Sequence, residues 1–328
     1  MRLLVTGGLG FIGSNFILYA LEKYPRFKIM NIDACLSGSN LRNLAGLRNK
    51  NYNYYKGNIT NKKIIDKLVS STDVVINFAA ESHVDRSIID AKPFINSNII
   101  GVYTILESIK KHRKKMIHIS TDEVFGSLKR GSANESYPLN PSSPYASSKA
   151  SAELLVKSYF STYNCDTIIA RCTNNFGPRQ SPEKFIPKVI LLAEKNKNIP
   201  IYGTGKNIRD WIFVLDHCEA ILRILFKGKT GESYNIAGKN ELDNITVVKK
   251  ILEIMGKSQH LIWFTNDRPG HDFRYSLDSK KITRELGWRP IYEFEKGLNH
   301  TISWYLKNMN WRKSISSKDM LTTLWKDR

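Results

Sequence analysis

The chain has 328 residues, 41% of them hydrophobic and 11% aromatic, with 50 Lys and Arg against 30 Asp and Glu. This length predicts two lobes, and the composition excludes a disordered or fibrous chain. A formal charge of +20 is compatible with a nucleic-acid surface. The lysines are scattered, however, without the interleaved aromatic platform of single-strand binders, so we expect no nucleic-acid partner.

The apolar runs are short throughout the chain. The first one, at residues 3–5, is too short for a signal peptide, and none approaches the ~20 residues of a membrane span. The four cysteines, at positions 35, 165, 172 and 218, show neither C-x-x-C pairing nor a histidine at metal spacing. We therefore expect a cytoplasmic protein with reduced thiols, no membrane association and no bound metal.

Strand-length apolar runs alternate with helix-length segments through the first half of the chain. Strands are expected at residues 3–6, 28–32, 74–78, 116–120 and 167–171, and helices at 11–23, 93–112 and 146–163. This alternation is typical of βαβ units, and continuous apolar strands indicate helices on both faces. The prediction is an α/β fold with a doubly wound parallel sheet of the Rossmann type.

The pattern changes after residue 175, where turn-rich stretches mix with shorter helical ones. Residues 1–175 are interpreted as a dinucleotide-binding domain, to which residues 209–236 return. Residues 176–208 and 237–311 would form a smaller, interleaved substrate-binding lobe. The polar tail, residues 312–328, is expected to be only partly ordered.

A glycine-rich loop follows the first expected strand. Gly7, Gly10 and Gly13 stand in a G-x-x-G-x-x-G pattern that opens a helix, where free N–H groups and the helix dipole suit a pyrophosphate. Asp33 ends the second expected strand, about 20 residues after Gly13, where a carboxylate would meet ribose hydroxyls and repel a 2′-phosphate. The pattern predicts NAD rather than NADP; the alternative is a tight turn without a ligand.

Tyr145 and Lys149 form a Tyr-x-x-x-Lys pair near the start of the third expected helix. Their spacing puts both side chains on one helix face. A tyrosine with a pKa of ~10 becomes a useful base when positive charges lower that value, and Lys149 and an oxidised nicotinamide could supply them. The alternative is an ordinary surface pair.

The stretch S-T-D-E-V-F-G at residues 120–126 adds two adjacent acids to these motifs. With N-F-A-A at 77–80, it resembles the extended short-chain dehydrogenase/reductase family, and within it the nucleotide-sugar 4,6-dehydratases. Further matches are A-E-S-H-V-D-R-S at 80–87, N-N-F-G-P at 174–178, P-E-K at 182–184, N-I-R-D-W at 207–211 and D-R-P-G-H at 267–271. The resemblance reaches to about residue 311.

The resemblance implies a catalytic group made of Thr121, Asp122, Glu123, Tyr145 and Lys149. Tyr145 would take the proton of the sugar 4-hydroxyl, Thr121 would hydrogen-bond that oxygen, and Lys149 would hold the cofactor ribose. After hydride transfer from C4 to NAD, ionised Glu123 would remove the C5 proton while protonated Asp122 expels the 6-hydroxyl as water. Hydride return to C6 would leave a 4-keto-6-deoxy sugar and restore NAD.

The resemblance also implies the binding residues. Cofactor contacts fall on Gly7, Gly10, Phe11, Ile12, Gly13, Asp33, Asn58, Ile59, Phe78, Ala79, Ala80, Ser82, Ser97, Tyr145, Lys149 and Asn175. Substrate contacts fall on Ser82, Thr121, Asn174, Lys184, Phe185, Pro200, Ile201, Tyr202, Arg209, Asn244, Asp267, Arg268 and His271. The basic members of this second set would face the substrate diphosphate.

Two stretches depart from the family pattern. Asn58 and Ile59 stand where the family has an Asp-Ile pair that reads adenine, so the cofactor's affinity is in question more than its identity. An amide oxygen can still accept from an exocyclic amine. Residues 34–39 also differ from the common K-L-T-Y-A-G, and Phe273 takes a position often held by a basic or aliphatic residue.

Several alternatives stay open at this stage. The resemblance favours a dTDP-glucose substrate, but UDP-glucose dehydratases share most of the motifs. An epimerase or decarboxylase of the same family is the rival enzyme, and Asp122 argues against it. An inactive NAD-binding protein is the rival outside enzymes, and the complete catalytic set argues against it. The family further implies a homodimer.

Overall fold

The computed structural model describes residues 1–314. Its strands are β1 (Arg2–Thr6), β2 (Lys28–Asp33), β3 (Tyr52–Lys56), β4 (Val74–Asn77), β5 (Lys115–Thr121), β6 (Thr167–Cys172), β7 (Asn174–Phe176), β8 (Ile199–Tyr202), β9 (Ile208–Phe213), β10 (Ser233–Ile236), β11 (Glu241–Asp243) and β12 (Ile262–Thr265).

The helices follow the strands along most of the chain. They are α1 (Phe11–Lys23), α2 (Lys62–Ser70), α3 (Val84–Ile89), α4 (Lys92–Phe94), α5 (Gly101–His112), α6 (Pro144–Tyr163), α7 (Phe185–Glu194), α8 (Val214–Lys227), α9 (Asn244–Ile254), α10 (Lys280–Leu286), α11 (Phe294–Lys307) and α12 (Met309–Lys313). Short turns are η1 (Leu41–Asn43), η3 (Asp122–Phe125) and η4 (Gln259–Leu261), with a π-helical segment η2 (Ile95–Ile100).

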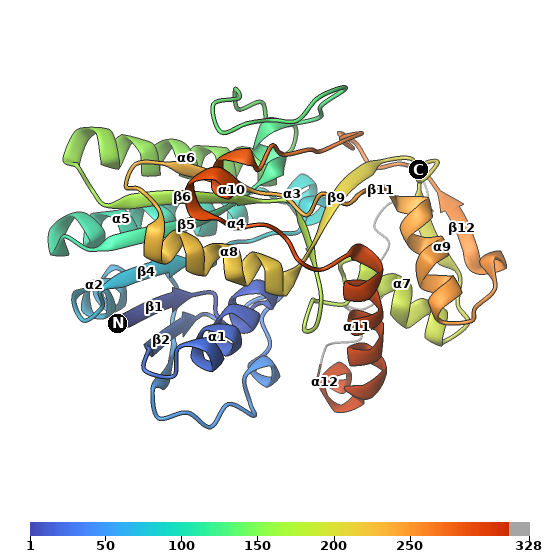
Figure 1. Ribbon diagram of the computed structural model, residues 1–328, viewed down its shortest axis with the longest axis horizontal. Helices are drawn as coiled ribbons and strands as arrows, with labels where there is room; N and C mark the ends of the chain where they lie inside the picture. Colours follow the sequence, from blue (N-terminus) through green and yellow to red (C-terminus); the bar gives the residue numbers. More distant parts are fainter. Residues whose placement is uncertain (315–328) are drawn as a thin grey trace.

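Seven strands form one sheet in the order β10-β6-β5-β4-β1-β2-β3. Every neighbouring pair in it is parallel. The predicted doubly wound sheet is therefore confirmed. The strand order reverses between β1 and β4, and in such sheets ligands bind outside the carboxyl ends of the strands at this point. Figure 1 shows α7, α9 and α11 gathered beside that end of the sheet.

Both faces of the sheet are covered by helices. On β1, Leu3 and Val5 belong to one buried cluster with residues of α1 and α8, whereas Leu4 belongs to a second cluster with residues of α2, α5 and α6. Successive side chains of a strand point to opposite faces, so this division follows from the continuous apolar run. The two layers fix the carboxyl end of β1 and the glycine loop that follows it.

A second group of elements has a core of its own. β9 pairs with β7 and β11 in a three-stranded sheet, and β8 pairs with β12. Buried residues of β7, β8 and β9 pack with those of α7, α9 and α11 in one cluster. β10, by contrast, extends the large sheet beside β6, and α8 packs on α1. The chain therefore leaves the large sheet after β6 and returns to it at α8.

The observed elements differ from the expected ones in several places, since neither β3 nor α2 was predicted. β3 has a half-polar sequence, Y-N-Y-Y-K, without the continuous apolar run on which the prediction depended. The helix expected at 93–112 is a succession of α4, η2 and α5. The expected tail starts within α12, where Arg312 pairs with Glu194, and its residues 315–328 lie outside the described part of the chain.

A fully buried ion pair joins α6 to β6. The Arg171 guanidinium donates to both carboxylate oxygens of Glu153, from Nε to Oε1 at 2.9 Å and to Oε2 at 3.0 Å, and from Nη2 to Oε2 at 2.7 Å. Both side chains are 0% exposed. The guanidinium also lies 4.9 Å from the centre of the Phe125 ring. Since neither charged group can reach water, each charge is compensated by the other.

We predict that Arg171→Met lowers the free energy of unfolding by about 3 to 5 kcal/mol, because it leaves the Glu153 carboxylate buried without its counter-ion. Urea denaturation followed by circular dichroism measures the loss. The matched control is Lys250→Met, which removes the surface pair with Glu295 and should cost less than about 1 kcal/mol. Equal losses in the two variants would refute the argument.

Candidate active site

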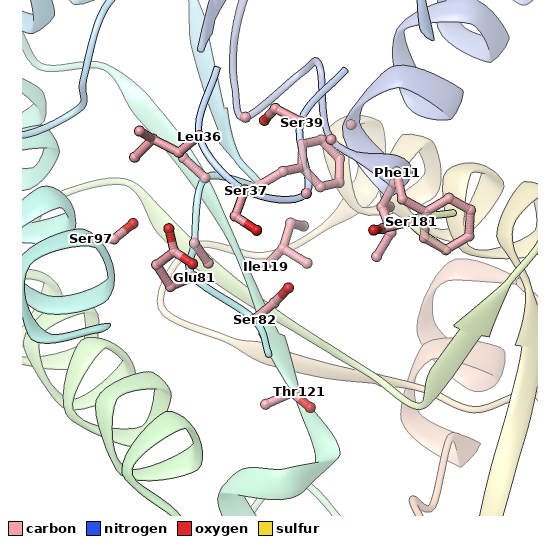
Figure 2. Close-up of a pocket in the computed structure, with 18 of the residues that line it drawn as sticks. Phe11, Leu36, Ser37, Ser39, Glu81, Ser82, Ser97, Ile119, Thr121 and Ser181 are labelled. Carbon is pink, nitrogen blue, oxygen red and sulfur yellow. The ribbon is translucent and has the colours of Figure 1, made fainter. Parts of the chain in front are cut away.

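A cavity of about 310 Å³ lies at the carboxyl ends of β1, β2, β4 and β5. The predicted residues that line it are Gly7, Gly10, Phe11, Ile12, Gly13, Asp33, Asn58, Ile59, Phe78, Ala79, Ala80, Ser82, Ser97, Thr121, Asp122, Glu123, Tyr145, Lys149, Asn174, Asn175 and Lys184. Figure 2 shows several of them, with Thr121 at one end and Phe11 and Ser97 on opposite sides. The structure thus brings together every predicted cofactor and catalytic residue.

The glycine loop leaves no room for side chains. A Cβ on Gly7, where φ is +69°, would lie 2.7 Å from the Ala79 backbone, and one on Gly13 would lie 2.5 Å from the Gly7 carbonyl oxygen. α1 begins directly after this loop with no side-chain cap, so the N–H groups of its first turn are available to an anion. The loop therefore fits a pyrophosphate held by backbone groups.

Asp33 is buried and strongly oriented by its neighbours. Its Oδ2 accepts from the N–H of Leu9 at 3.0 Å, and its Oδ1 accepts from the N–H of Cys35 and from the Ser39 hydroxyl. These bonds hold the carboxylate at the cavity wall, where the sequence places a ribose-reading group. The residues present fit NAD.

Asn58 lines the cavity, but its amide oxygen is already engaged. Oδ1 accepts from both the N–H and the hydroxyl of Thr60, at 2.9 and 3.0 Å. A carbonyl oxygen has two lone pairs, so a third donor would have to displace one of these bonds. For this oxygen to accept from adenine, the adenine amine would have to replace one of the two Thr60 donors.

Asp122 and Glu123 begin η3 at the end of β5. Thr121 caps this turn by accepting from the N–H of Glu123, and its hydroxyl donates to Asp122 Oδ1 at 3.1 Å. Burial, followed by the charge of Glu123, raises the pKa of Asp122 well above its ordinary value. Its Oδ2 is buried without a hydrogen-bond partner among the described residues. Burial and the charge of Glu123 outweigh the hydrogen bond from Thr121 and favour the protonated form of Asp122.

Glu123 has a different environment from its neighbour. Burial also raises its pKa, but Arg268, Arg209 and Lys184 oppose that shift through their positive charges. Two adjacent acids with unequal surroundings can hold different protonation states. The pair therefore has the asymmetry that an acid and a base working together require.

Tyr145 lies beside this pair at the start of α6. Burial and the negative charge of Glu123 raise its pKa well above 10, while a hydrogen bond with Thr121 opposes the rise. From the sequence, a positive charge was expected to lower this pKa, but burial is the largest effect and raises it. The Lys149 ammonium donates to the carbonyl oxygen of Ile119 at 2.6 Å. Burial also lowers the pKa of Lys149 to about 8.

The remaining predicted substrate residues lie outside the cavity wall. They are Phe185, Pro200, Ile201, Tyr202, Arg209, Asn244, Asp267, Arg268 and His271. Ile201 is 1% exposed and packs in the core of the second group of elements. Phe185 stacks on Trp211, with the ring centres 6.1 Å apart. The structure thus does not bring these side chains to the glycine loop.

Two of these outlying residues meet at a buried carboxylate of α3. Arg268 Nη1 lies 2.8 Å from Asp85 Oδ1, and the Tyr202 hydroxyl donates to Asp85 Oδ2 at 3.1 Å. Asp85 thereby links the first lobe to β8 and to the loop after β12. The sequence analysis did not assign this residue, although it stands in the quoted motif at 80–87.

Tyr275 and Asp272 were also missed by the sequence analysis. The Tyr275 hydroxyl donates to Asp272 at 2.6 Å and lies 3.5 Å from Glu123 Oε2. The Arg209 guanidinium lies over the Tyr275 ring, 4.3 Å from its centre. These contacts connect the second lobe to Glu123. Neither residue belongs to a quoted motif, and no local pattern distinguishes them.

A protein-family model described as GDP-mannose 4,6 dehydratase matches residues 4–301. The chain belongs to this family. The dTDP-glucose 4,6-dehydratase of Mycolicibacterium smegmatis is 42% identical to it, covering 100% of this chain and 99% of that protein. The low-salt glycan biosynthesis protein Agl12 of Haloferax volcanii is 46% identical, covering 93% and 99%.

Solved structures agree with this assignment. The dTDP-glucose 4,6-dehydratase DesIV from Streptomyces venezuelae, crystallised with NAD, superposes with a TM-score of 0.93 at 41% identity, covering 95% of this chain and 98% of that one. A UDP-glucose 4-epimerase from Thermotoga maritima superposes with a TM-score of 0.88 at 27% identity, covering 94% and 100%. The similarity is therefore stronger to the dehydratase than to the epimerase.

No metal centre is formed by the described residues, which contain no group of three or more His, Cys, Asp or Glu side chains suited to an ion. Among residues 1–314, no helix is both long and apolar enough to cross a membrane.

We predict that the rate of the elimination step falls at low pH with a midpoint above 4.5, the ordinary pKa of a glutamate. Glu123 must be ionised to act as the base. Because its pKa is raised, it becomes protonated and inactive at a higher pH than an ordinary glutamate would. Initial rates measured from pH 4 to 8 give the midpoint.

The control is Glu81→Gln, because Glu81 lines the same cavity and burial raises its pKa as well. This variant should keep the midpoint of the acid limb. A wild-type rate that stays constant down to pH 4, or a limb that disappears in the Glu81 variant, would contradict the assignment of Glu123.

Proposed function

We propose that this chain is a dTDP-glucose 4,6-dehydratase that converts the nucleotide sugar to its 4-keto-6-deoxy product. The observation that carries the proposal is the pair Asp122 and Glu123 at the end of β5, on the same cavity wall as Tyr145 and Lys149. An oxidation at C4 alone would need only the tyrosine and the lysine. The two acids add the means to remove water.

The proton transfers follow from the positions of these residues. Tyr145 would accept the proton of the 4-hydroxyl once the positive charge of the oxidised nicotinamide offsets the effect of burial on its pKa, and Thr121 would hold that oxygen. The glycine loop and Asp33 would hold NAD, which would supply the hydride chemistry: the acceptor for the hydride of C4 and the donor of the same hydride to C6. Once C4 is a ketone the C5 proton is acidic, so Glu123 removes it while Asp122 gives its proton to the leaving 6-hydroxyl. When C6 receives its hydride, Glu123 returns the proton to C5, so that at the end of the turnover Tyr145 has gained one proton and Asp122 has lost one.

Positive charges of the second lobe support binding of the substrate diphosphate. Lys184 lines the cavity, and Arg209 and Arg268 lie close enough to affect Glu123. Arg268 is held by Asp85, from which a diphosphate could take over the guanidinium. An epimerase or decarboxylase has no use for the protonated acid Asp122, so the dehydratase remains the better reading.

A division into two lobes accompanies this proposal. We propose residues 1–175, with 209–236, as the cofactor domain, and residues 176–208 and 237–311 as the substrate lobe. The separate cores of the large sheet and of β7, β8 and β9 support it. β9 is an exception within the returning segment, since it pairs with β7 and β11.

A cytoplasmic location is also proposed. Its support is the state of the four cysteines, all of which carry free thiols: Cys35, Cys165, Cys172 and Cys218. Three of these are buried, and structural disulfides are characteristic of oxidising compartments.

We predict that the protein converts dTDP-glucose to a product with the alkaline absorbance of a 4-keto sugar. UDP-glucose should be used with a kcat/KM lower by about tenfold or more, because one methyl group in an apolar pocket is worth ~1 to 3 kcal/mol. The measurement is the initial rate with each substrate. Absence of product from both would refute the proposal.

The control is Asp122→Asn, which keeps the size of the side chain but cannot donate the acidic proton. This variant should still oxidise C4, which is seen as the absorbance of the reduced nicotinamide of bound NADH. Elimination should slow by about 100-fold or more. Normal elimination would remove Asp122 from the mechanism. Net accumulation of NADH together with product would contradict the internal return of the hydride.

Finally, we predict a homodimer that forms through α5 and α6. These neighbouring helices carry exposed apolar side chains, among them Tyr103, 47% exposed, and Leu154, 58% exposed. Light scattering should give twice the chain mass, and the double variant Tyr103→Glu, Leu154→Glu should give a monomer. Ile291→Glu, at an exposed site elsewhere, is the control and should leave the dimer intact. A monomeric wild type would refute the prediction.

A further inference from the structure

One arginine joins two loops that border the cofactor cavity. Arg86 lies in α3, and its Nη1 donates to the Ser37 hydroxyl. Its Nη2 lies 2.6 Å from Glu183 Oε2. Ser37 belongs to the loop between β2 and η1, and Glu183 to the loop before α7. Both line the cavity, whereas Arg86 does not.

The two loops approach the cavity from different parts of the chain. Figure 2 shows Leu36, Ser37 and Ser39 of the first loop, and Ser181 of the second, bordering the same space. The first loop contains Gly38 at a φ of +83° and the exposed Leu36. It also continues from Asp33, the residue that fits the cofactor ribose. A bridge between these loops therefore joins two segments of the cavity wall from outside the cavity.

The second loop is fastened to the segment before α3 at a further point. The Lys184 ammonium donates to the Ser82 carbonyl oxygen at 2.7 Å. The Glu183 side chain is only 9% exposed, so its pairing with Arg86 is shielded on one side. Because the loop at 181–184 is anchored in this way, the hydrogen bond from Arg86 to Ser37 connects the first loop to a fixed part of the structure.

We propose that Arg86 is a clasp that holds the loops at 36–39 and 181–184 together at the border of the cavity and so slows the release of NAD. The inference rests on the proposed function, in which NAD ends each turnover in its starting form. Such an enzyme gains nothing from exchanging its cofactor, and a slow release keeps the site ready.

The chemistry of the side chain suits this role. A guanidinium presents several N–H groups in a rigid plane, so one Arg can serve a carboxylate and a hydroxyl at the same time. A lysine in its place offers a single point charge. Ser37 stands in the stretch at 34–39, which departs from the family's common sequence.

The test is the dissociation rate of NADH from the full-length protein, followed by the loss of its fluorescence when excess NAD is added. Arg86→Ala should raise this rate by about tenfold or more and lower the NAD content of the purified protein. Ser37→Ala, which keeps the ion pair, should raise the rate less. Arg86→Lys should fall between the wild type and Arg86→Ala. Added NAD should restore the kcat of Arg86→Ala.

The control is Arg26→Ala, at an exposed arginine before β2 and thus at the opposite end of that strand from the cavity. Its NADH dissociation rate should equal that of the wild type. Circular dichroism checks that each variant is folded. If Arg86→Ala does not fold, the dissociation rate of Ser37→Ala is the test. A wild-type rate in the folded Arg86→Ala or, failing that, in Ser37→Ala would overturn the proposal.

Failure of this proposal is distinguishable from failure of the proposed function. If the wild type converts dTDP-glucose and Arg86→Ala releases NADH at the wild-type rate, only the clasp is wrong. If neither sugar nucleotide is converted but Arg86→Ala releases NADH faster, the clasp stands and the substrate assignment falls.

Discussion

The placement of two neighbouring carboxyl groups in one cavity, Asp122 buried and Glu123 partly buried, is the constraint on which the site depends. Asp122 and Glu123 follow β5 directly, so the parallel sheet carries them to the edge where the cavity lies. Burial makes ionisation of both at once unfavourable. One acid therefore keeps its proton and the other is compensated by charge from elsewhere. The rest of the structure supplies the compensating positive charge mainly to Glu123.

The second lobe provides the compensation. Arg209, Arg268 and Lys184 come from segments that follow β6, yet all three act on Glu123. Arg209 is aligned by the Tyr275 ring, and Arg268 by Asp85. The interleaved path of the chain matters for this reason. A lobe attached by a single linker could not place three cations around one carboxylate as firmly as a lobe crossed by the chain several times.

The local features of the fold were readable from the sequence, and the long-range ones were not. The glycine loop, Asp33 and the Tyr145–Lys149 pair follow from spacing along one strand or one helix, and the structure brings them to one cavity. Asp85 and Tyr275 act through contacts with residues more than a hundred positions away. The hydrophobic periodicity of a sequence does not indicate such long-range contacts. β3 escaped for a different reason, because its sequence is half polar.

α6 illustrates how closely stability and chemistry are joined in this chain. Tyr145, Lys149 and Glu153 follow one another at intervals of four, so a single helix face bears the base, the ammonium group and the buried partner of Arg171. A rotation or slip of this helix by one residue would misplace all three. The ion pair between Glu153 and Arg171 thus fixes the rotation of α6 about its own axis, and with it the direction in which the catalytic face of the helix points.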